Sequence, residues 1–331
     1  MSTFQAFRIH DEGGVHGRFD KLTLGQLTPG DVVIDVHFSD INYKDALAAT
    51  GAGKILRRYP LVGGIDLAGV VRESADARYQ PGDAVLVTGC GLSETVDGGY
   101  SQVARVVGDS VIPVPPGLDA FRAMALGTAG FTAALAIHRM ERNGQTPARG
   151  PVVVTGASGG VGSVAVDMLA ARGYSVIAVS GKPEAAAYLR DLGAGEVVTR
   201  ETLALGSKPL EAARFAGAID NVGGELLAGL TRHMDFWGNI ASVGLAGGAK
   251  LETTVMPFIL RGVNLLGINS SATRREERLE VWRRIGSDLA PRHLDRIVTR
   301  TIRLDELPGA FQAYLDGKVM GRTVVRIGPQ P

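Results

Sequence analysis

The chain has 331 residues, of which 45% are hydrophobic and 21% are charged, a composition typical of a globular protein long enough for two domains. Its 35 basic and 34 acidic side chains leave a formal net charge of +1, so nucleic acid is not an expected partner. The single cysteine, Cys90, excludes an internal disulfide and a thiolate-rich zinc site.

The N-terminal residues lack the apolar core of a signal peptide. The sequence contains no run of about 20 apolar residues, which is the length that a membrane-spanning helix needs. We therefore expect a cytoplasmic protein with no membrane partner.

Residues 1–125 carry short strand patterns separated by turns, which indicates an all-β, barrel-like domain. Hydrophobic residues alternate at Val32, Ile34, Val36 and Phe38, the period of a strand with one buried face. A Pro-Gly-Asp turn sequence precedes this run and recurs before a later one. The strands expected here cover residues 4–9, 32–38, 84–87 and 100–107.

The stretch from Val152 to Gly162 joins a run of β-branched residues to a glycine cluster. Apolar residues then recur with the period of a helix that has one buried face. Glycines let the backbone approach a ligand, and the free amides and helix dipole favour a pyrophosphate. The pattern therefore predicts a dinucleotide site, with a strand-to-helix turn that binds nothing as the alternative.

The end of the next strand indicates which dinucleotide is bound. An NAD site usually has an acidic residue there, which binds the ribose hydroxyls. The strand expected at 175–180 ends instead in Ser180, Gly181 and Lys182. A hydroxyl and a cation suit a 2′-phosphate, so NADPH is the predicted cofactor. A solvated loop lysine is the alternative for Lys182, and Glu184 nearby weakens the phosphate interpretation.

From residue 151 onward, strands and helices alternate, which predicts βαβ units and a parallel sheet. Thr273 and Glu276 have the spacing of a capping box, and we expect the helix that they open to end the nucleotide domain. The run 263–268 is expected as the last strand, and an unpaired edge there would favour a homodimer. Burial under a tail loop is the alternative for this strand. The other elements expected are helices at 127–140 and 226–236 and strands at 152–154, 218–220 and 239–244.

The C-terminal tail is expected to pair with the first domain, through a strand at 297–302, a helix at 305–315 and a strand at 323–327. We expect residues 1–125, completed by 303–331, to form the barrel domain. Residues 126–302 are expected to form the nucleotide domain.

The order of these parts resembles the medium-chain dehydrogenase/reductase superfamily across the whole chain. The chain is most similar to its zinc-free, quinone-oxidoreductase-like branch and, within that branch, to bacterial NADPH-dependent acryloyl-CoA reductases. The resemblance implies an α/β fold, with a GroES-like β-barrel domain and a doubly wound, parallel-sheet Rossmann domain. The stretches that carry it are residues 42–45, 60–66, 127–133, 154–162 and 254–261.

The chain departs from the zinc alcohol dehydrogenases at their metal ligands. Those enzymes bind zinc through a cysteine in the early loop and a histidine in a Gly-His-Glu motif. This chain has Asn42 in the loop and Gly64-Ile65-Asp66 at the motif. Ile65 cannot bind a metal, so no metal site is expected. Without a Lewis acid, hydride transfer to a conjugated carbon is favoured over alcohol oxidation.

The resemblance also implies a set of cofactor-binding residues. Arg200 would help Lys182 to hold the 2′-phosphate, with a surface salt bridge as the alternative. Leu245 and Ser270 would approach the nicotinamide half, and core packing is the alternative for Leu245 and Ile259. The full set is Tyr43, Thr128, Ser158, Gly159, Gly160, Val161, Ser180, Gly181, Lys182, Arg200, Leu245, Ile259, Ser270 and Gly317.

Tyr43 and Asn42 are the catalytic candidates, because the matching loop of the superfamily lines the cleft between the domains. Tyr43 could contact the nicotinamide and donate the proton that completes reduction. The alternatives are packing against the cofactor, capping of a strand end, or protonation by solvent. Asn42 could instead fix its own loop. The basic residues Lys54, Arg57 and Arg58 could bind phosphates of coenzyme A, with a solvated surface as the alternative.

The resemblance implies NADPH-dependent reduction of the C=C bond of acryloyl-CoA to propionyl-CoA, by hydride transfer to the β-carbon without a metal. An NADPH-dependent quinone or enone reductase is the alternative within the same fold, since the shape of the pocket decides between these substrates. From another functional class, the chain could be a non-catalytic NADPH-binding structural or sensor protein. The expected partners are a small enoyl-CoA substrate and a second copy of the chain.

Overall fold

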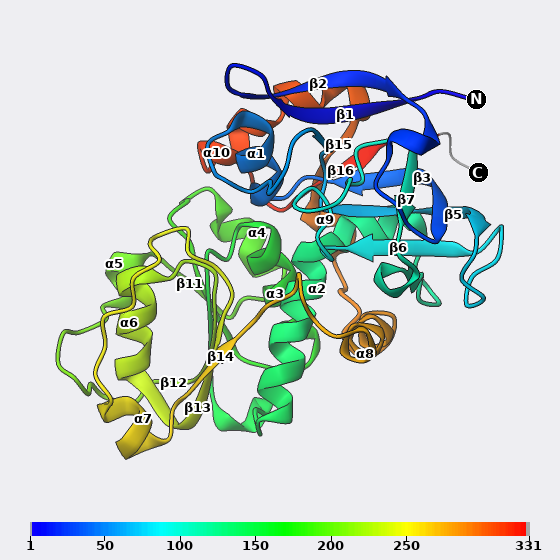
Figure 1. Ribbon diagram of the computed structural model, residues 1–331. Helices are drawn as coiled ribbons and strands as arrows, with labels where there is room; N and C mark the ends of the chain where they lie inside the picture. Colours follow the sequence, from blue (N-terminus) through cyan, green and yellow to red (C-terminus); the bar gives the residue numbers. More distant parts are fainter. Residues whose placement is uncertain (1, 329–331) are drawn as a thin grey trace. The chain divides into compact units, whose positions relative to one another are not determined.

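The chain divides into two compact units, and the computed structural model describes residues 2–328 (Figure 1). The first unit contains the residues up to 128, residues 270–286 and the residues from 298 onward. The second contains residues 129–269 and 287–297. These units differ from the expected domain boundaries, because residues 126–128, 270–286 and 298–302 belong to the first unit.

The first unit is built mainly on antiparallel strands. They are β1 (Phe4–Asp11), β2 (Val15–Leu22), β3 (Val32–Asp40), β4 (Leu61–Val62), β5 (Asp66–Ser74), β6 (Ala84–Thr88), β7 (Val103–Val106), β8 (Ile112–Pro113), β15 (Val298–Arg303) and β16 (Arg322–Arg326). One sheet has the order β15-β16-β3-β5-β6-β8, with β7 paired to β3, and the other has the order β2-β1-β4. Because β16 pairs with β3, the tail returns to the first unit as predicted.

The sequence pattern did not predict β2. This strand pairs with β1 over its full length, from Phe4 opposite Leu22 to Asp11 opposite Val15. Most of its side chains are partly exposed. Polar residues therefore interrupt the alternation that marks a half-buried strand.

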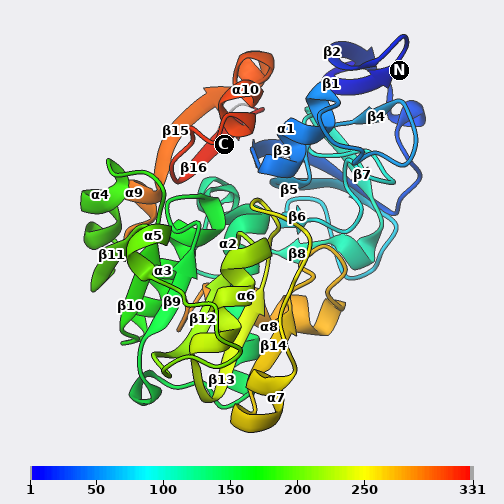
Figure 2. The same ribbon diagram turned by 90° about the vertical axis from the view of Figure 1, so that its left-hand side faces the viewer.

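The second unit contains a six-stranded sheet in which every pair of neighbouring strands is parallel. Its strands are β9 (Val152–Thr155), β10 (Val176–Val179), β11 (Glu196–Val198), β12 (Phe215–Asp220), β13 (Met234–Ser242) and β14 (Asn264–Gly267). Figure 2 shows their order, β11-β10-β9-β12-β13-β14. This doubly wound order confirms the predicted α/β fold, with β14 at the edge.

Helices cover both faces of this parallel sheet (Figure 1). The helices α5 (Arg200–Leu203) and α6 (Gly224–His233) lie on one face, whereas α2 (Ala120–Arg142) and α3 (Gly160–Ala171) lie on the other. Every residue of the central strands β9 and β12 is buried, as expected for a sheet covered on both sides.

Each unit has its own apolar core. In the first unit, Ile34 of β3 and Leu67 of β5 are fully buried in one cluster. In the second unit, Val153, Ala218 and Ile240 pack together from three adjacent strands. A separate core in each unit is typical of two domains.

Three element boundaries differ from the sequence prediction. Within α2, Gly127 has non-helical torsions (φ 52°, ψ −153°), so the expected helix start lies at a break inside a longer element. The helix expected at 226–236 ends at His233, because β13 begins at the next residue. The expected capping box is wrong, since Arg274 is the N-cap of α8 (Arg275–Ile285) and no side chain caps it.

One described helix, α2, is long and apolar enough to cross a membrane. However, 78% of its most apolar stretch is buried inside the structure. Such burial is typical of a core helix.

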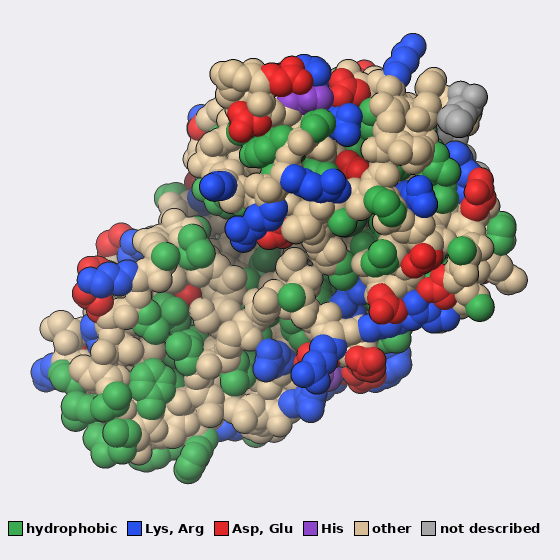
Figure 3. All heavy atoms as spheres, viewed as in Figure 1, with side chains coloured by type: hydrophobic (Ala, Val, Ile, Leu, Met, Phe, Trp, Pro, Cys, Tyr) green, Lys and Arg blue, Asp and Glu red, His purple; other side chains and the backbone are tan. Residues whose placement is uncertain are grey.

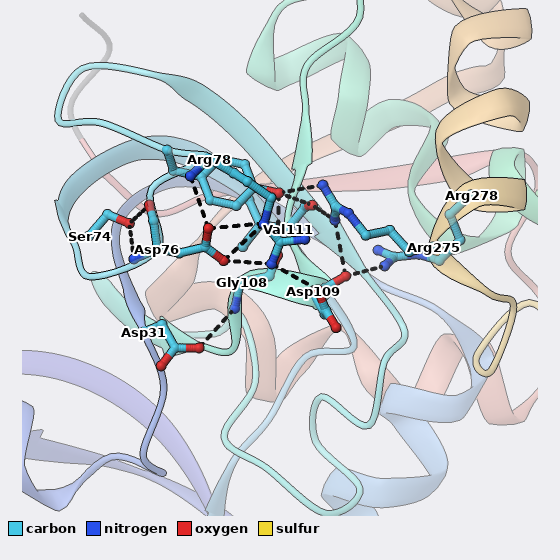
Figure 4. A network of polar contacts seen from close by, with 10 residues as sticks. Asp31, Ser74, Asp76, Arg78, Gly108, Asp109, Val111, Arg275 and Arg278 are labelled. Atoms are coloured by element: carbon cyan, nitrogen blue, oxygen red, sulfur yellow. Dashed lines mark hydrogen bonds and ion pairs between the residues drawn. The ribbon is translucent and has the colours of Figure 1, made fainter.

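The helix α8 belongs to the first unit because its arginines bind the loops of the barrel (Figure 4). Arg275 donates a hydrogen bond to the Tyr79 hydroxyl at 2.7 Å. The side chain of Arg278 is buried and donates to the carbonyls of Asp109 at 3.2 Å and Ser110 at 2.6 Å. These long-range bonds cannot be read from the helix sequence, which explains why the sequence pattern grouped this helix with the nucleotide domain.

We expect Arg278→Ala to lower the free energy of unfolding by roughly 2–4 kcal/mol, because a large buried side chain is removed and the buried carbonyl of Ser110 loses its donor. The matched control is Arg283→Ala on the same helix, where the arginine is 63% exposed and pairs with Glu280. This control is expected to cost less than about 1 kcal/mol. Denaturant unfolding measures both effects, and equal losses would contradict the anchoring role.

Candidate functional site

The second unit has a topological switch point between β9 and β12, where the order of its strands reverses. Thr155 ends β9 and donates its hydroxyl to Asp220, the last residue of β12, at 2.6 Å. The amide of Asn221 donates to the Thr155 hydroxyl oxygen at 2.9 Å. Burial raises the pKa of Asp220, and hydrogen bonds from Thr155 and the Gly223 amide oppose this shift. These bonds hold the two strand ends together at the edge where α/β sheets bind ligands.

Between β9 and α3 the chain makes the glycine turn that the sequence predicts. Gly156 has φ 58°, in the left-handed region that favours glycine. A Cβ on Gly162 would lie 2.3 Å from the Gly156 carbonyl oxygen, so no side chain fits there. Because α3 begins at Gly160, the amides of its first turn have no acceptor within the helix. Those amides and the helix dipole suit a pyrophosphate.

Ser158 and Ser180 bring the glycine turn and the end of β10 together. Their hydroxyl oxygens lie 3.1 Å apart, and Ser180 Oγ accepts from the Lys182 amide at 3.1 Å. A Cβ on Gly181 would contact nothing within 4 Å, so the space there is open. Lys182 is half-buried, and this burial lowers the pKa of its ammonium group, while Glu184 opposes the shift. Hydroxyls and a partly desolvated cation therefore stand where an NAD site usually has a carboxylate.

Three further predicted cofactor residues lie on the surface of the second unit. Arg200 begins α5 and forms no ion pair within the described residues, so the salt-bridge alternative is not observed. Leu245 is 67% exposed and Ile259 is 72% exposed, which excludes core packing for both. Leu245 also lines a hollow of about 230 Å³ at the carboxyl ends of β12 and β13.

In the first unit, Asn42 precedes α1 (Tyr43–Thr50) and is held by three side chains. Its amide nitrogen donates to Asp40 Oδ1 at 2.7 Å and to Asp66 Oδ2 at 2.8 Å. Its amide oxygen accepts from Arg322 at 3.0 Å. Both amide hydrogens thus have acceptors, which favours the interpretation that Asn42 fixes its own loop.

Asp40, Asp45 and Asp66 form a buried carboxyl cluster around that loop. Arg322 pairs with Asp40 at 2.6 Å, and Asp45 accepts from two backbone amides, at 2.8 and 2.9 Å. Burial raises the pKa of Asp45 to about 7. Burial also raises the pKa of Asp40 well above its usual range, although Arg322 opposes the shift. Local sequence patterns do not reveal this cluster, because its carboxyls lie in segments that are distant along the chain.

The other predicted residues of the first unit are more accessible. Tyr43 is the first residue of α1 and is 51% exposed, so it does not cap a strand end. Thr128 is half-buried and donates its amide and hydroxyl to Asp66, at 2.8 and 2.5 Å. Ser270 is half-buried in a loop, and Gly317 (φ 65°) lies in the turn after α10 (Phe311–Leu315). Of these residues, Thr128 is the one that the structure joins to the carboxyl cluster.

The basic residues Lys54, Arg57 and Arg58 lie exposed in the loop after α1. Figure 3 shows Lys and Arg side chains gathered on one face of the first unit. Arg58 donates to the Thr95 carbonyl at 2.9 Å and to the Thr28 hydroxyl at 2.8 Å. Lys54 and Arg57 have no polar side-chain partner within the described residues, so they are better placed than Arg58 to bind a phosphate.

Comparison with known proteins establishes the family. Residues 28–133 match the alcohol dehydrogenase GroES-like domain, and residues 160–287 match the zinc-binding dehydrogenase domain. Acrylyl-CoA reductase AcuI of Ruegeria pomeroyi is 48% identical over 96% of this chain and 96% of that protein. The chain belongs to the medium-chain dehydrogenase/reductase superfamily. It is therefore an oxidoreductase, as the sequence predicts.

Two solved structures of similar proteins cover the whole fold. The yhdH oxidoreductase of Salmonella enterica in complex with NADP has a TM-score of 0.95 and 46% identity, and the match covers 98% of this chain and 100% of that one. The Bacillus subtilis protein yhfP with NAD bound has a TM-score of 0.95 and 44% identity, with the same coverage. That protein is named provisionally as a quinone oxidoreductase. These matches confirm the predicted GroES-like and Rossmann domains.

The raised pKa of Asp45 predicts a pH-dependent stability. The folded protein holds the Asp45 proton more tightly than the unfolded chain, so the contribution of Asp45 to stability is lost as the pH rises from near 3.8 to about 7. Asp45→Asn removes this titration. We therefore expect the variant to gain stability relative to the wild type across that window, although it loses one hydrogen bond at every pH.

Denaturant unfolding at about pH 4.5 and about pH 8 measures this difference. The control is Asp305→Asn, an exposed carboxylate whose pKa Arg303 lowers, and it is expected to show no relative change in this window. A constant gap between Asp45→Asn and the wild type would contradict the assigned proton.

Proposed function

We propose that this chain reduces the C=C bond of acryloyl-CoA to propionyl-CoA with NADPH, by hydride transfer to the β-carbon. The observation that carries the proposal is the 48% identity to acrylyl-CoA reductase AcuI of Ruegeria pomeroyi over 96% of both chains. The geometry of the glycine turn and of the Ser180 to Lys182 segment supports the cofactor part of the proposal independently.

Two groups of residues in the second unit would bind different phosphates of the cofactor. Ser158, Gly159, Gly160 and Val161 would hold the pyrophosphate, because they form the turn and the first turn of α3. The 2′-phosphate would be bound by Ser180, Gly181, Lys182 and Arg200, through a hydroxyl, an open glycine and two cations. A similar protein with NADP bound supports this choice, whereas another with NAD bound makes cofactor preference the property to test.

Tyr43 is the proposed proton donor of the first unit. NADPH supplies the hydride, and the α-carbon of the substrate then needs a proton. Tyr43 is the first residue of α1 and is 51% exposed. General acid catalysis by a positioned side chain contributes roughly 100-fold to 10,000-fold. Asn42 supports the same loop, because both of its amide hydrogens are bound within the protein.

The reaction is proposed to proceed without zinc. Within residues 2–328, no three His, Cys, Asp or Glu side chains are placed to bind a metal ion. Asn42 is held by Asp40 and Asp66, and Ile65 offers only a hydrocarbon side chain. The donor set therefore does not fit the metal that one of the domain descriptions implies.

Lys54 and Arg57 are proposed to bind phosphates of coenzyme A. Both are exposed, and their side chains have no polar partner within the described part of the chain. Arg58 would contribute less, because its guanidinium already binds Thr95 and Thr28.

A homodimer in the cytoplasm is the proposed state of the protein. The edge strand β14 has Leu265 38% exposed, and in the same unit Phe236 and Trp237 are 58% and 67% exposed. Figure 3 shows hydrophobic side chains gathered around α7 (Met256–Arg261) in this unit. An unpaired edge beside exposed apolar side chains favours pairing with a second copy of the chain.

The substrate panel of acryloyl-CoA, crotonoyl-CoA and benzoquinone with NADPH tests the proposal. We expect the highest kcat/KM with acryloyl-CoA, unchanged after treatment with a chelator. A preference for benzoquinone would favour the quinone reductase. Stoichiometric NADPH binding without turnover of any substrate would favour the non-catalytic alternative.

Lys182→Asp tests the phosphate contact. We expect the KM for NADPH to rise roughly 50-fold or more, and the KM for NADH to change less than about threefold, because only NADPH loses a charged contact. Lys208→Asp is the matched control, since Lys208 is an exposed lysine of the same unit. Equal effects of Lys182→Asp on the two cofactors would contradict the contact.

A further inference from the structure

The loop after α1 that carries the exposed cations is fixed at two adjacent positions. We call residues 54–58 the basic loop. The backbone amide of Arg57 donates to the Glu94 carbonyl at 2.8 Å. The Nε atom of Arg58 donates to the Thr95 carbonyl at 2.9 Å. The basic loop is therefore held both by its backbone and by one of its own arginines.

The second contact of Arg58 leads through Thr28 to a buried carboxyl group. Arg58 Nη2 donates to the Thr28 hydroxyl oxygen at 2.8 Å. That hydroxyl donates its hydrogen to Asp97 Oδ2 at 2.7 Å and accepts from the Asp97 amide at 3.1 Å. Asp97 is 5% exposed, and its Oδ1 accepts from the Val62 amide at 2.8 Å. The Thr28 hydroxyl thus uses its one hydrogen and both lone pairs to fix Arg58 within the protein.

The turn that receives these bonds is itself closely bonded. We call residues 91–97 the acceptor turn. The Gly91 carbonyl accepts from the backbone amides of residues 94–96, at 3.1, 2.9 and 3.1 Å. Ser93 is buried and has φ 57°, in the left-handed region that residues other than glycine seldom occupy. The acceptor turn is therefore a specifically built support for the basic loop.

Both acidic residues of the acceptor turn have partners outside the basic loop. Glu94 pairs with Lys44 of α1 at 2.7 Å, and the carboxyl group of Asp97 accepts the bonds described above. Lys54 and Arg57 are exposed, and their side chains have no polar partner within residues 2–328. The fixed loop thus presents two cations that the neighbouring carboxyl groups do not neutralise.

We propose that Arg58 is a positioning residue, which acts through Thr28 to hold the basic loop ready for the phosphates of coenzyme A. The cations that meet the phosphates are Lys54 and Arg57. The inference rests on the proposed function, which assigns these two cations to coenzyme A. A mobile loop loses conformational entropy when it binds an anion, whereas a fixed loop avoids most of that cost. The contribution of Arg58 therefore comes from order in the loop, and not from its charge.

Thr28→Val tests this inference because it removes the acceptor of Arg58 without changing any charge. We expect the KM for acryloyl-CoA to rise roughly threefold to tenfold, the range for one lost hydrogen bond, with kcat unchanged. Acryloyl-pantetheine has the same reacting group but no phosphate, so its KM is expected to stay the same. Thr28→Ser retains the hydroxyl and is expected to restore the wild-type KM.

Thr95→Val is the matched control within the acceptor turn. The Thr95 hydroxyl is exposed and donates to the Gly91 carbonyl at 3.4 Å, whereas it is the Thr95 backbone that binds Arg58. This variant is expected to leave the KM for both thioesters unchanged. An unchanged KM for acryloyl-CoA in Thr28→Val, or an equal rise for both thioesters, would overturn the inference.

A double-mutant cycle keeps the test decisive if Thr28→Val fails to fold. Arg58→Ala replaces an exposed side chain and is expected to raise the KM for acryloyl-CoA roughly threefold or more. In a Lys54→Ala/Arg57→Ala background the same change is expected to have no further effect, because no cation is left to position. An effect of the same size in both backgrounds means that Arg58 binds a phosphate itself, which overturns the positioning role.

The wild type separates failure of this inference from failure of the proposed function. We expect its kcat/KM to be higher for acryloyl-CoA than for acryloyl-pantetheine, and the difference to shrink as salt screens the phosphates. Equal kcat/KM values for the two thioesters would retain the proposed reaction and overturn the phosphate contact. Reduction of neither thioester would overturn the proposed function and this inference together.

Discussion

The first unit depends on the burial of three carboxyl groups beside a single arginine. Asp40, Asp45 and Asp66 are at most 1% exposed, and Arg322 is 2% exposed. Burying charged groups is costly unless they are neutralised or hydrogen-bonded, so the cluster draws donors from several segments and retains protons. Because Arg322 lies on β16, the barrel is complete only when the C-terminal strand has returned to it. The same bonds order the loop that carries Tyr43.

In the second unit the main electrostatic feature is a set of amides and a lysine suited to bind a phosphorylated anion. The parallel sheet places the ends of β9 and β10 at one edge, and the glycine turn leaves amides at the start of α3. Ser158 and Ser180 join the turn to the second strand end, where Lys182 is partly desolvated. The backbone thus supplies a pyrophosphate site common to dinucleotide-binding folds, and the side chains at 180–182 supply the preference for a 2′-phosphate.

Local patterns in the sequence predicted the elements that depend on local physics. The β-branched run at 152–155, the glycine turn and the helix after it were all expected, because strand propensity, glycine torsions and helical periodicity act over a few residues. The position of α8 was not predictable, since it depends on bonds from Arg275 and Arg278 to loops over 160 residues away. The carboxyl cluster was missed for the same reason. The break in α2 at Gly127 was not predictable either, because it depends on the close approach of Gly127 to Asp40, which no local pattern shows.

The measurement that tests the proposed reaction most directly is the position of the transferred hydrogen. Acryloyl-CoA is reduced with NADPH deuterated at the transferable position of the nicotinamide, and the product is examined by NMR. One deuterium on the β-carbon of propionyl-CoA, with a solvent-exchangeable proton delivered to the α-carbon, is the predicted result. Deuterium on the α-carbon, or no propionyl-CoA under conditions where a quinone is reduced, would contradict it.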